Sequence, residues 1–129
     1  MRLKLLIFIV AYNAEKTIIN LLSRIPKNIQ NDFDTEILII DDFSTDDTFK
    51  IAKEFIKNID WCKIYLGKTS ENLGYGGNQK LGYLFAINNY FDYVCLLHGD
   101  AQYAPEHIID LVEPLKNTSN DLDAILGSR

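Results

Sequence analysis

The chain has 129 residues, of which 47% are hydrophobic and 24% are charged, and its formal net charge is −5. This length suits one globular domain with a single core, and the composition is that of soluble folded proteins. A pI of about 4.9 argues against nucleic acid or an anionic membrane as the main partner of this segment. A polyanionic ligand would therefore have to be met by local basic groups or by a metal ion.

The two cysteines, Cys62 and Cys95, lie beside predicted strands and lack metal-binding spacing. We interpret them as reduced, packed thiols of a cytoplasmic protein. Residues 1–11 imitate a signal peptide, with two basic residues and a short apolar run, but the run passes directly into a polar segment and a helical pattern. We therefore interpret it as a strand, and it is too short to span a bilayer.

Short apolar runs alternate with helical patterns along the chain. The runs predict strands at residues 3–11, 36–40, 61–66 and 93–97, and a fifth strand that begins at 124–126. Helices are predicted after a cap at Asn13, after a cap at Ser44, at about 78–90 and at 105–115, with a polar loop at 27–35. Strands that alternate with helices predict an α/β fold, with a mostly parallel sheet and helices on both faces.

Three of the predicted strands end in polar residues that suit ligand binding. Tyr12 and Asn13 follow the first strand, Asp41 and Asp42 the second, and residues 98–102 the fourth. In an open α/β sheet, ligands bind beyond the carboxyl ends of the strands. Tyr12 offers a ring for stacking on a base, and the aspartates offer an acceptor for a uracil imide or a ribose hydroxyl. The plainer alternatives are a buried aromatic residue and an acidic turn.

His98, Asp100 and Gln102 stand at alternate positions after the fourth predicted strand. An imidazole, a carboxylate and an amide carbonyl in this pattern suit one divalent ion, Mn²⁺ or Mg²⁺. The alternative is a strand end at which Asp100 and Gln102 bond nearby backbone. The motif alone leaves both interpretations open.

A glycine-rich segment, residues 72–77, precedes the third predicted helix. Its glycines allow positive φ and close backbone approach, and free N–H groups at a helix start favour phosphate. The segment is neither a Walker loop nor a dinucleotide fingerprint, so taken alone it predicts a flexible turn. Lys80, one turn into the helix, either meets a phosphate or lies in solvent.

Five blocks of the sequence, in this order, resemble the family 2 glycosyltransferases of GT-A fold, specifically their N-terminal nucleotide-binding half. The blocks are IVAYNAEKTI at 9–18, LIIDDFSTDDT at 38–48, ENLGYGGNQKLG at 71–82, LLHGDAQYAPE at 96–106 and GSR at 127–129. The resemblance implies a Rossmann-like GT-A domain that binds a nucleoside-diphosphate sugar, linked to UDP or GDP. It implies metal-assisted transfer of the sugar, with inversion.

The resemblance also implies the residues of the site. Those expected to contact the nucleotide-sugar are Val10, Ala11, Tyr12, Asn13, Glu15, Asp41, Asp42, Gly74, Gly76, Lys80 and Asp100. The D-x-D segment of the family binds the metal, which points to Asp100, with His98 and Gln102 assisting. A family variant reading D-x-D-x-Q-x-x-P-E is similar to the polyprenyl-phosphate glycosyltransferases, and it matches His98, Asp100, Gln102, Pro105 and Glu106.

The chain departs from the family pattern at four positions. His98 replaces the first aspartate of the D-x-D, which removes one negative charge, although an imidazole can still bind Mn²⁺. Val10 stands where proline is usual, Phe43 where glycine is usual and Tyr75 where lysine is common. The last departure removes a phosphate contact that Lys80 would have to supply.

The sequence stops at Arg129, where the predicted fifth strand ends. In the family, the acceptor-binding segment and the general base lie beyond this point, so we expect a donor-binding half, truncated before the acceptor half, with no catalytic base of its own. The acceptor is expected to be a polyprenyl phosphate, a lipid or a glycan. We expect the full-length protein at the cytoplasmic face of the membrane, and an unsheltered sheet edge favours a homodimer.

Two other functions are consistent with parts of the sequence. A non-catalytic module that binds nucleotide-sugar, or a regulatory domain, would explain the altered metal motif and the missing acceptor half. A phosphoacceptor receiver domain would explain the length and the acidic pair Asp41 and Asp42. Receivers carry that pair after the first strand, however, and here it follows the second.

Overall fold

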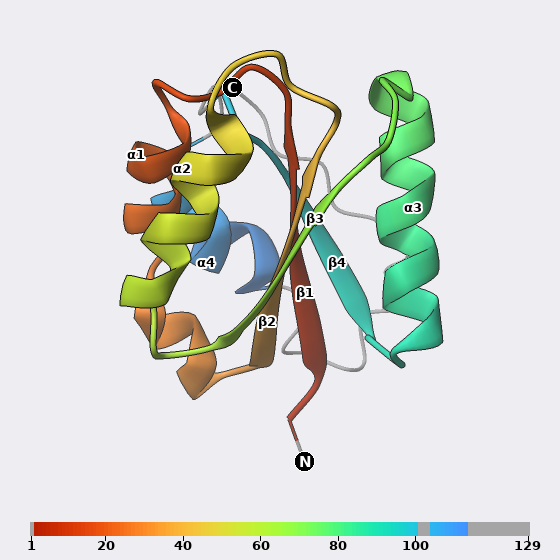
Figure 1. The fold of residues 1–129 in the computed structure, drawn as a ribbon. Coiled ribbons are helices and arrows are strands. Elements are labelled where there is room, and N and C mark those ends of the chain that lie inside the picture. The colour runs from red at the N-terminus through yellow and green to blue at the C-terminus, as the bar shows by residue number, and fades with distance from the viewer. Residues whose placement is uncertain (1, 101–103, 114–129) are drawn as a thin grey trace.

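The computed structural model of the chain describes residues 2–100 and 104–113, and these form a parallel sheet with helices on both faces (Figure 1). The strands are β1 (Lys4–Ala11), β2 (Asp34–Asp41), β3 (Lys63–Lys68) and β4 (Tyr93–His98). Their order across the sheet is β3-β2-β1-β4, and each neighbouring pair is parallel. This arrangement confirms the predicted α/β fold.

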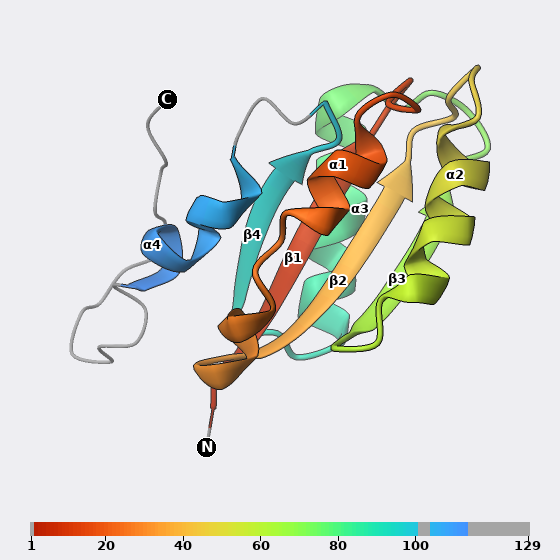
Figure 2. The same ribbon diagram turned by 90° about the vertical axis from the view of Figure 1, so that its left-hand side faces the viewer.

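The helices divide between the two faces of the sheet (Figures 1 and 2). On one face lie α1 (Ile18–Ser23), α2 (Thr48–Phe55) and α4 (Ile108–Val112), and on the other lies α3 (Gly74–Asn88). Short 3-10 turns are η1 (Lys27–Asn31), η2 (Ile56–Asn58) and η3 (Pro105–His107). The steps from β1 to β2 to β3 run one way across the sheet, and the step to β4 runs back. Because crossovers keep one hand, α3 is placed opposite α1 and α2.

The core has two layers, one on each side of the central strand β1. Leu5, Ile7 and Ile9 pack with α1, α2 and α4, whereas Leu6, Phe8 and Val10 pack toward α3. All six side chains are buried, as expected of a strand covered on both faces. The apolar run at the start of the sequence therefore forms the central strand, with a core layer on each of its faces.

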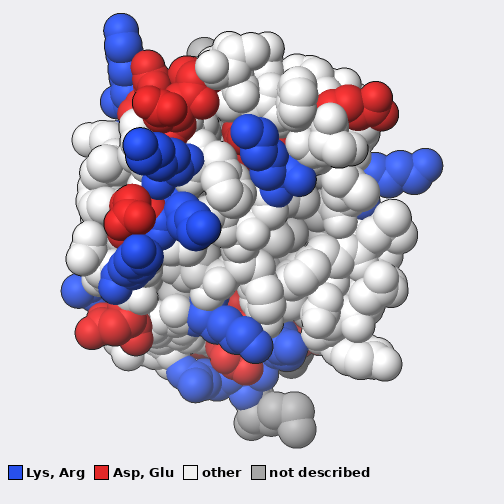
Figure 3. Space-filling model, viewed as in Figure 1, with Lys and Arg blue, Asp and Glu red and all other residues white. Residues whose placement is uncertain are grey.

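The helix α3 is buried along one side and apolar on the other. Asn78, Gly82 and Ala86 face the sheet, while Leu84 and Ile87 are exposed. The surface over α3 carries few charged side chains, and most charges in the same view gather over the helices of the opposite face (Figure 3). Within the described residues, no helix is long and apolar enough to cross a membrane.

Several predicted boundaries on the α1 and α2 side were wrong. Asn13 does not cap α1, because that helix begins at Ile18 after Thr17, and Asn13 takes a left-handed conformation with φ 48°. The predicted loop at 27–35 contains η1 and the first residues of β2, because two apolar residues, Ile29 and Phe33, anchor it to the core.

The boundaries of α2, β3 and α3 also differ from the prediction. Ser44 does not cap α2, which begins at Thr48 after Asp47, and β3 begins at Lys63. The predicted flexible turn is helical from Gly74, so α3 begins four residues before the predicted Asn78. Gly74 itself has a φ of 74°, which lies outside the helical region, and the chain enters the helix through this residue. The predicted fifth strand lies outside the described residues.

Candidate functional site

The carboxyl ends of the parallel strands lie at the same end of the sheet, and the order of strands changes direction at β1. From β1, the chain continues to β2 and β3 on one side, and β4 lies on the other side. Such a switch point is where open α/β sheets bind ligands. Val10 of β1 and His98 of β4 are register partners there, and the Gly99 N–H donates to the Val10 carbonyl at 2.8 Å. The predicted ligand-binding strand ends are therefore neighbours in space.

The end of β1 presents an aromatic ring to solvent. Val10 and Ala11 are buried, but the next residue, Tyr12, is 49% exposed, so it is not the buried aromatic of the plainer interpretation. Asn13 shapes the turn that follows: its N–H donates to Ser44 Oγ at 2.9 Å, and its side-chain oxygen accepts the Thr45 N–H at 2.9 Å. Asn13 thus ties the loop that carries Tyr12 to the turn after β2.

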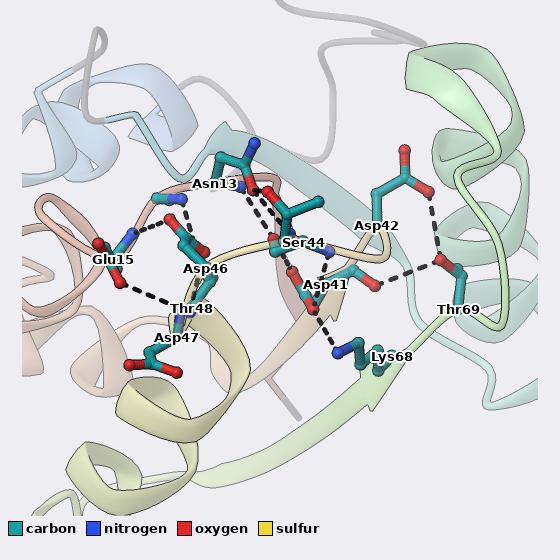
Figure 4. A network of polar contacts seen from close by, with 12 residues as sticks. Asn13, Glu15, Asp41, Asp42, Ser44, Asp46, Asp47, Thr48, Lys68 and Thr69 are labelled. Carbon is teal, nitrogen blue, oxygen red and sulfur yellow. Dashed lines mark hydrogen bonds and ion pairs between the residues drawn. The ribbon is translucent and has the colours of Figure 1, made fainter.

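Asp41, at the end of β2, is the centre of a buried polar network (Figure 4). Its side chain is 1% exposed. It accepts hydrogen bonds from the Ser44 hydroxyl and, at 3.4 Å, from the Ser44 N–H. The Lys68 ammonium lies 4.0 Å from Oδ2. Since a buried carboxylate needs such partners, Asp41 orders the turn after β2, and the ammonium offsets its charge.

Asp42 connects β2 to the segment between β3 and α3. Its Oδ1 accepts the Leu73 N–H at 2.8 Å and the Thr69 hydroxyl at 3.3 Å. Its own N–H donates to the Ala11 carbonyl at 2.8 Å. The second carboxylate oxygen points away from Thr69 (Figure 4). Of the two adjacent aspartates, Asp42 is therefore the one whose geometry suits both a structural bond and a ligand.

Glu15 joins the loop after β1 to the start of α2. Its carboxylate accepts the Asp47 N–H at 3.0 Å, and its N–H donates to Asp46 at 3.3 Å. Burial alone would raise the pKa of Asp46, but hydrogen bonds from the Thr48 hydroxyl and from backbone N–H groups outweigh it and lower the pKa. The Glu15 side chain thus supports the loop, and its predicted contact with a nucleotide-sugar stays a prediction.

The glycine-rich segment forms the first turn of α3. Gly74 and Gly76 both lie in this turn, a few residues after the end of β3 in the sequence. Lys80 is exposed two residues after the fully buried Asn78. At about 100° per residue, this spacing turns Lys80 away from the sheet. Its placement gives no support to the predicted phosphate contact, whereas Lys68 lies at the strand ends, beside Asp41.

The end of β4 carries the predicted metal ligands. His98 Nε2 lies 2.8 Å from the Tyr75 hydroxyl, and the two rings stack at 16° with their centroids 4.8 Å apart. Asp100 follows at an exposed turn position, and Gln102 lies outside the described residues. The Thr17 hydroxyl donates to the Gly99 carbonyl at 2.6 Å, which fixes the start of this turn to the end of the loop before α1.

Among the described residues, no group of three His, Cys, Asp or Glu side chains gathers as a metal site. An imidazole and a carboxylate two positions apart at the strand end are nevertheless donors that Mn²⁺ accepts. The chemistry of His98 and Asp100 thus fits part of a manganese site, and it suits Mg²⁺, which prefers oxygen ligands, less well.

The sequence analysis missed three residues of the polar network: Ser44, Lys68 and Thr69. Ser44 stands three residues after Asp41, a spacing that allows a side chain to bond a turn, and this signal could have found it. Lys68 ends β3 and Thr69 follows it, whereas the sequence predicts that this strand ends at residue 66, which leaves both residues outside the predicted strand end.

Solved structures share this architecture. The chain superimposes on a mannosyltransferase from Pyrobaculum calidifontis, solved with GDP-Man and Mn²⁺, with a TM-score of 0.73, 17% identity and coverage of 94% of this chain and 34% of that one. With S. aureus TarS 1-349 in complex with UDP-GlcNAc, the TM-score is 0.60, the identity 20% and the coverage 87% and 32%. The parallel sheet and its helices therefore define a domain of the GT-A glycosyltransferase fold.

The sequence places the chain in a family within that class. It belongs to glycosyl transferase family 2, which matches residues 6–128. It is 33% identical over 133 aligned residues to a UDP-N-acetylglucosamine--dolichyl-phosphate N-acetylglucosaminyltransferase of Methanococcus voltae. That alignment covers 95% of this chain and 51% of the relative, so the chain spans about half of the relative's length.

Proposed function

We propose that the protein containing this chain transfers a sugar from a nucleoside-diphosphate sugar to a polyprenyl phosphate, and that this chain binds the donor. The observation that carries the proposal is the convergence of Tyr12, Asp42 and His98 at the switch point of the sheet. The acceptor class is supported by the archaeal relative, whose name specifies dolichyl phosphate.

The strand ends divide the work of holding the donor. The exposed Tyr12 ring stacks on the base, and the outward oxygen of Asp42 accepts a hydrogen bond from the base or the ribose. Both oxygens of Asp41 are already engaged by Ser44 and Lys68, so Asp41 keeps the turn after β2 in place instead. An acceptor oxygen then attacks the anomeric carbon with inversion, and the nucleoside diphosphate leaves with the bonding electron pair.

A divalent ion, Mn²⁺ in preference to Mg²⁺, would be held by Asp100 with His98 and Gln102. When bound, it would offset the negative charge that develops on the leaving diphosphate. Without the ion, Lys68 is a cation at the described strand ends that could meet this charge, but its ammonium is already directed at Asp41.

Calorimetric titration with UDP and GDP, each with and without Mn²⁺, tests this proposal. We expect binding that requires Mn²⁺ and a clear preference for one nucleotide. Asp100→Ala should abolish the increase in nucleotide affinity that Mn²⁺ causes. Asp60→Ala is a matched control, because it removes an exposed carboxylate just before β3, at the opposite edge of the sheet, and it should bind as the wild type does.

The outcomes separate the proposal from its rival. No binding of either nucleotide would refute donor binding, and unchanged Mn²⁺ dependence in Asp100→Ala would refute the metal ligand. Full-length protein that binds a donor sugar but neither transfers nor hydrolyses it would favour a non-catalytic binding module.

A further inference from the structure

The two departures from the family pattern nearest the predicted metal site, Tyr75 and His98, are in direct contact. The rings are stacked, and the Tyr75 hydroxyl lies 2.8 Å from Nε2 of His98. The two residues are 23 positions apart in the chain and come from different elements, α3 and β4. They form one local unit on the α3 side of the sheet edge.

The fold brings this pair together by two simple constraints. Alternate residues of a strand point to the same face, and Leu96 of β4 packs in the core layer under α3, so His98 points to that side as well. The helix α3 starts at Gly74, which places Tyr75 in its first turn, above the end of β4. A later helix start, as the sequence predicted, would leave Tyr75 in a loop.

A tyrosine hydroxyl can either donate a hydrogen bond to a ring nitrogen or accept one from a ring N–H. The two cases have opposite consequences for metal binding by the ring. If the hydroxyl donates to Nε2, the neutral imidazole carries its proton on Nδ1, and neither nitrogen has a lone pair available for an ion. If Nε2–H donates to the hydroxyl, Nδ1 has an available lone pair. Histidines that bind metals generally donate their other N–H to a neighbouring acceptor in this way.

We propose that Tyr75 is a positioning residue, which accepts the Nε2–H of His98 and thereby presents Nδ1 of that ring to the divalent ion beside Asp100. This inference rests on the proposed function for the identity of the ion. It assigns the site a neutral histidine held by a tyrosine in place of the carboxylate of the family pattern. The same contact fixes the plane of the imidazole, because the rings are stacked.

The first test needs no metal. The chain has two histidines, His98 and His107. In nitrogen NMR of full-length protein labelled on histidine, the ring system that disappears in His98→Asn is assigned to His98. We expect the proton of neutral His98 on Nε2. A proton on Nδ1 in the wild-type protein would overturn the inference, whatever the protein binds.

The second test measures the affinity for Mn²⁺ in the presence of UDP or GDP, from the free-ion signal in electron paramagnetic resonance. Tyr75→Phe keeps the ring and removes the hydroxyl, and we expect it to weaken Mn²⁺ binding by about ten-fold or more. Tyr83→Phe makes the same change on α3, where the Tyr83 ring lies edge-on to Phe8 at 6.3 Å, and it should leave the affinity unchanged.

Each result has a definite meaning. Unchanged affinity in Tyr75→Phe would show that the hydroxyl does not position His98. Tighter binding would show that Tyr75 competes with the ion for Nε2, which also overturns the inference. A wild-type protein that binds nucleotide without Mn²⁺ would refute the metal part of the proposed function instead, and the NMR result would still decide the role of Tyr75.

Discussion

The helix α3 approaches the sheet closely at Gly82, which lies directly on the Phe8 ring. A Cβ atom built on Gly82 would fall 2.0, 2.2 and 2.4 Å from three atoms of that ring. Phe8 is fully buried in the central strand, with α3 on one side and its own backbone on the other, so the ring has little room to retreat. Gly82→Ala should therefore destabilise the protein even though it places a better helix former in α3.

The size of the effect follows from two opposing terms. To reach ordinary contact, the nearest ring atom would have to move by about 1.4 Å, and forcing extra atoms into a packed core costs about 1–3 kcal/mol. Replacing glycine by alanine within a helix returns up to about 1 kcal/mol. An overlap of this size places the cost in the upper half of that range, so we expect a net loss of about 1–2 kcal/mol in the free energy of unfolding.

Urea denaturation, followed by the fluorescence of Trp61, measures this loss. Gly76→Ala is the matched control, because it makes the same change in the same helix at a position where a Cβ would meet nothing within 4 Å. It should be neutral or stabilise the protein by up to about 1 kcal/mol. Equal stability of the two variants would refute the steric argument. Gly82→Ala should also cost less in a Phe8→Leu background, if the ring is the cause.

Three further predictions concern stability and reactivity. Asn78 is fully buried and neither of its side-chain polar atoms has a hydrogen bond partner, so Asn78→Leu should raise the free energy of unfolding by about 1–3 kcal/mol, and a loss in urea denaturation would contradict this. Arg24 hydrogen-bonds Glu106 at 2.8 Å and lowers the pKa of that carboxyl below 4.5. Glu106→Gln should therefore reduce thermal stability at pH 7, and the difference from wild type should disappear as the pH falls through the lowered pKa. A difference that stays constant with pH would argue against the ion pair. Burial raises the pKa of Cys62 and Cys95 to about 12, so at pH 8 both thiols should react with a disulfide reagent far more slowly in folded than in urea-unfolded protein.

The sheet could be predicted from the sequence because its signal is local. The runs that form β1, β2 and β4 are apolar on both faces, short and rich in strand-favouring residues, and together these features favour a strand covered on both sides. The start of α3 could not be predicted in the same way, because glycines favour a turn by their backbone freedom. In the folded chain, the helix nevertheless extends through the glycines from Gly74, and it packs on β1, β2 and β4.

The candidate site could be predicted as a set of strand ends but not as a set of roles. Asp41 and Asp42 are identical in type and adjacent, and only the spacing to Ser44 distinguishes them locally. Their difference arises from the turn that follows, in which Ser44 bonds Asp41, and from the later segment at Leu73, which bonds one oxygen of Asp42. The Leu73 contact comes from the tertiary arrangement of the loops, so the sequence identifies the strand ends before it assigns a role to each carboxylate.

Two departures from the family pattern, His98 and Tyr75, lie together in the fold. Considered one at a time along the sequence, His98 removes a negative charge from the metal motif and Tyr75 removes a cation from the phosphate contact. In the fold these two side chains are stacked on each other, so the losses fall at one place and offset each other in charge. The two side chains are also joined by a hydrogen bond between the Tyr75 hydroxyl and His98 Nε2, which orders both of them. For this reason the two positions are best tested as one unit rather than as two separate defects.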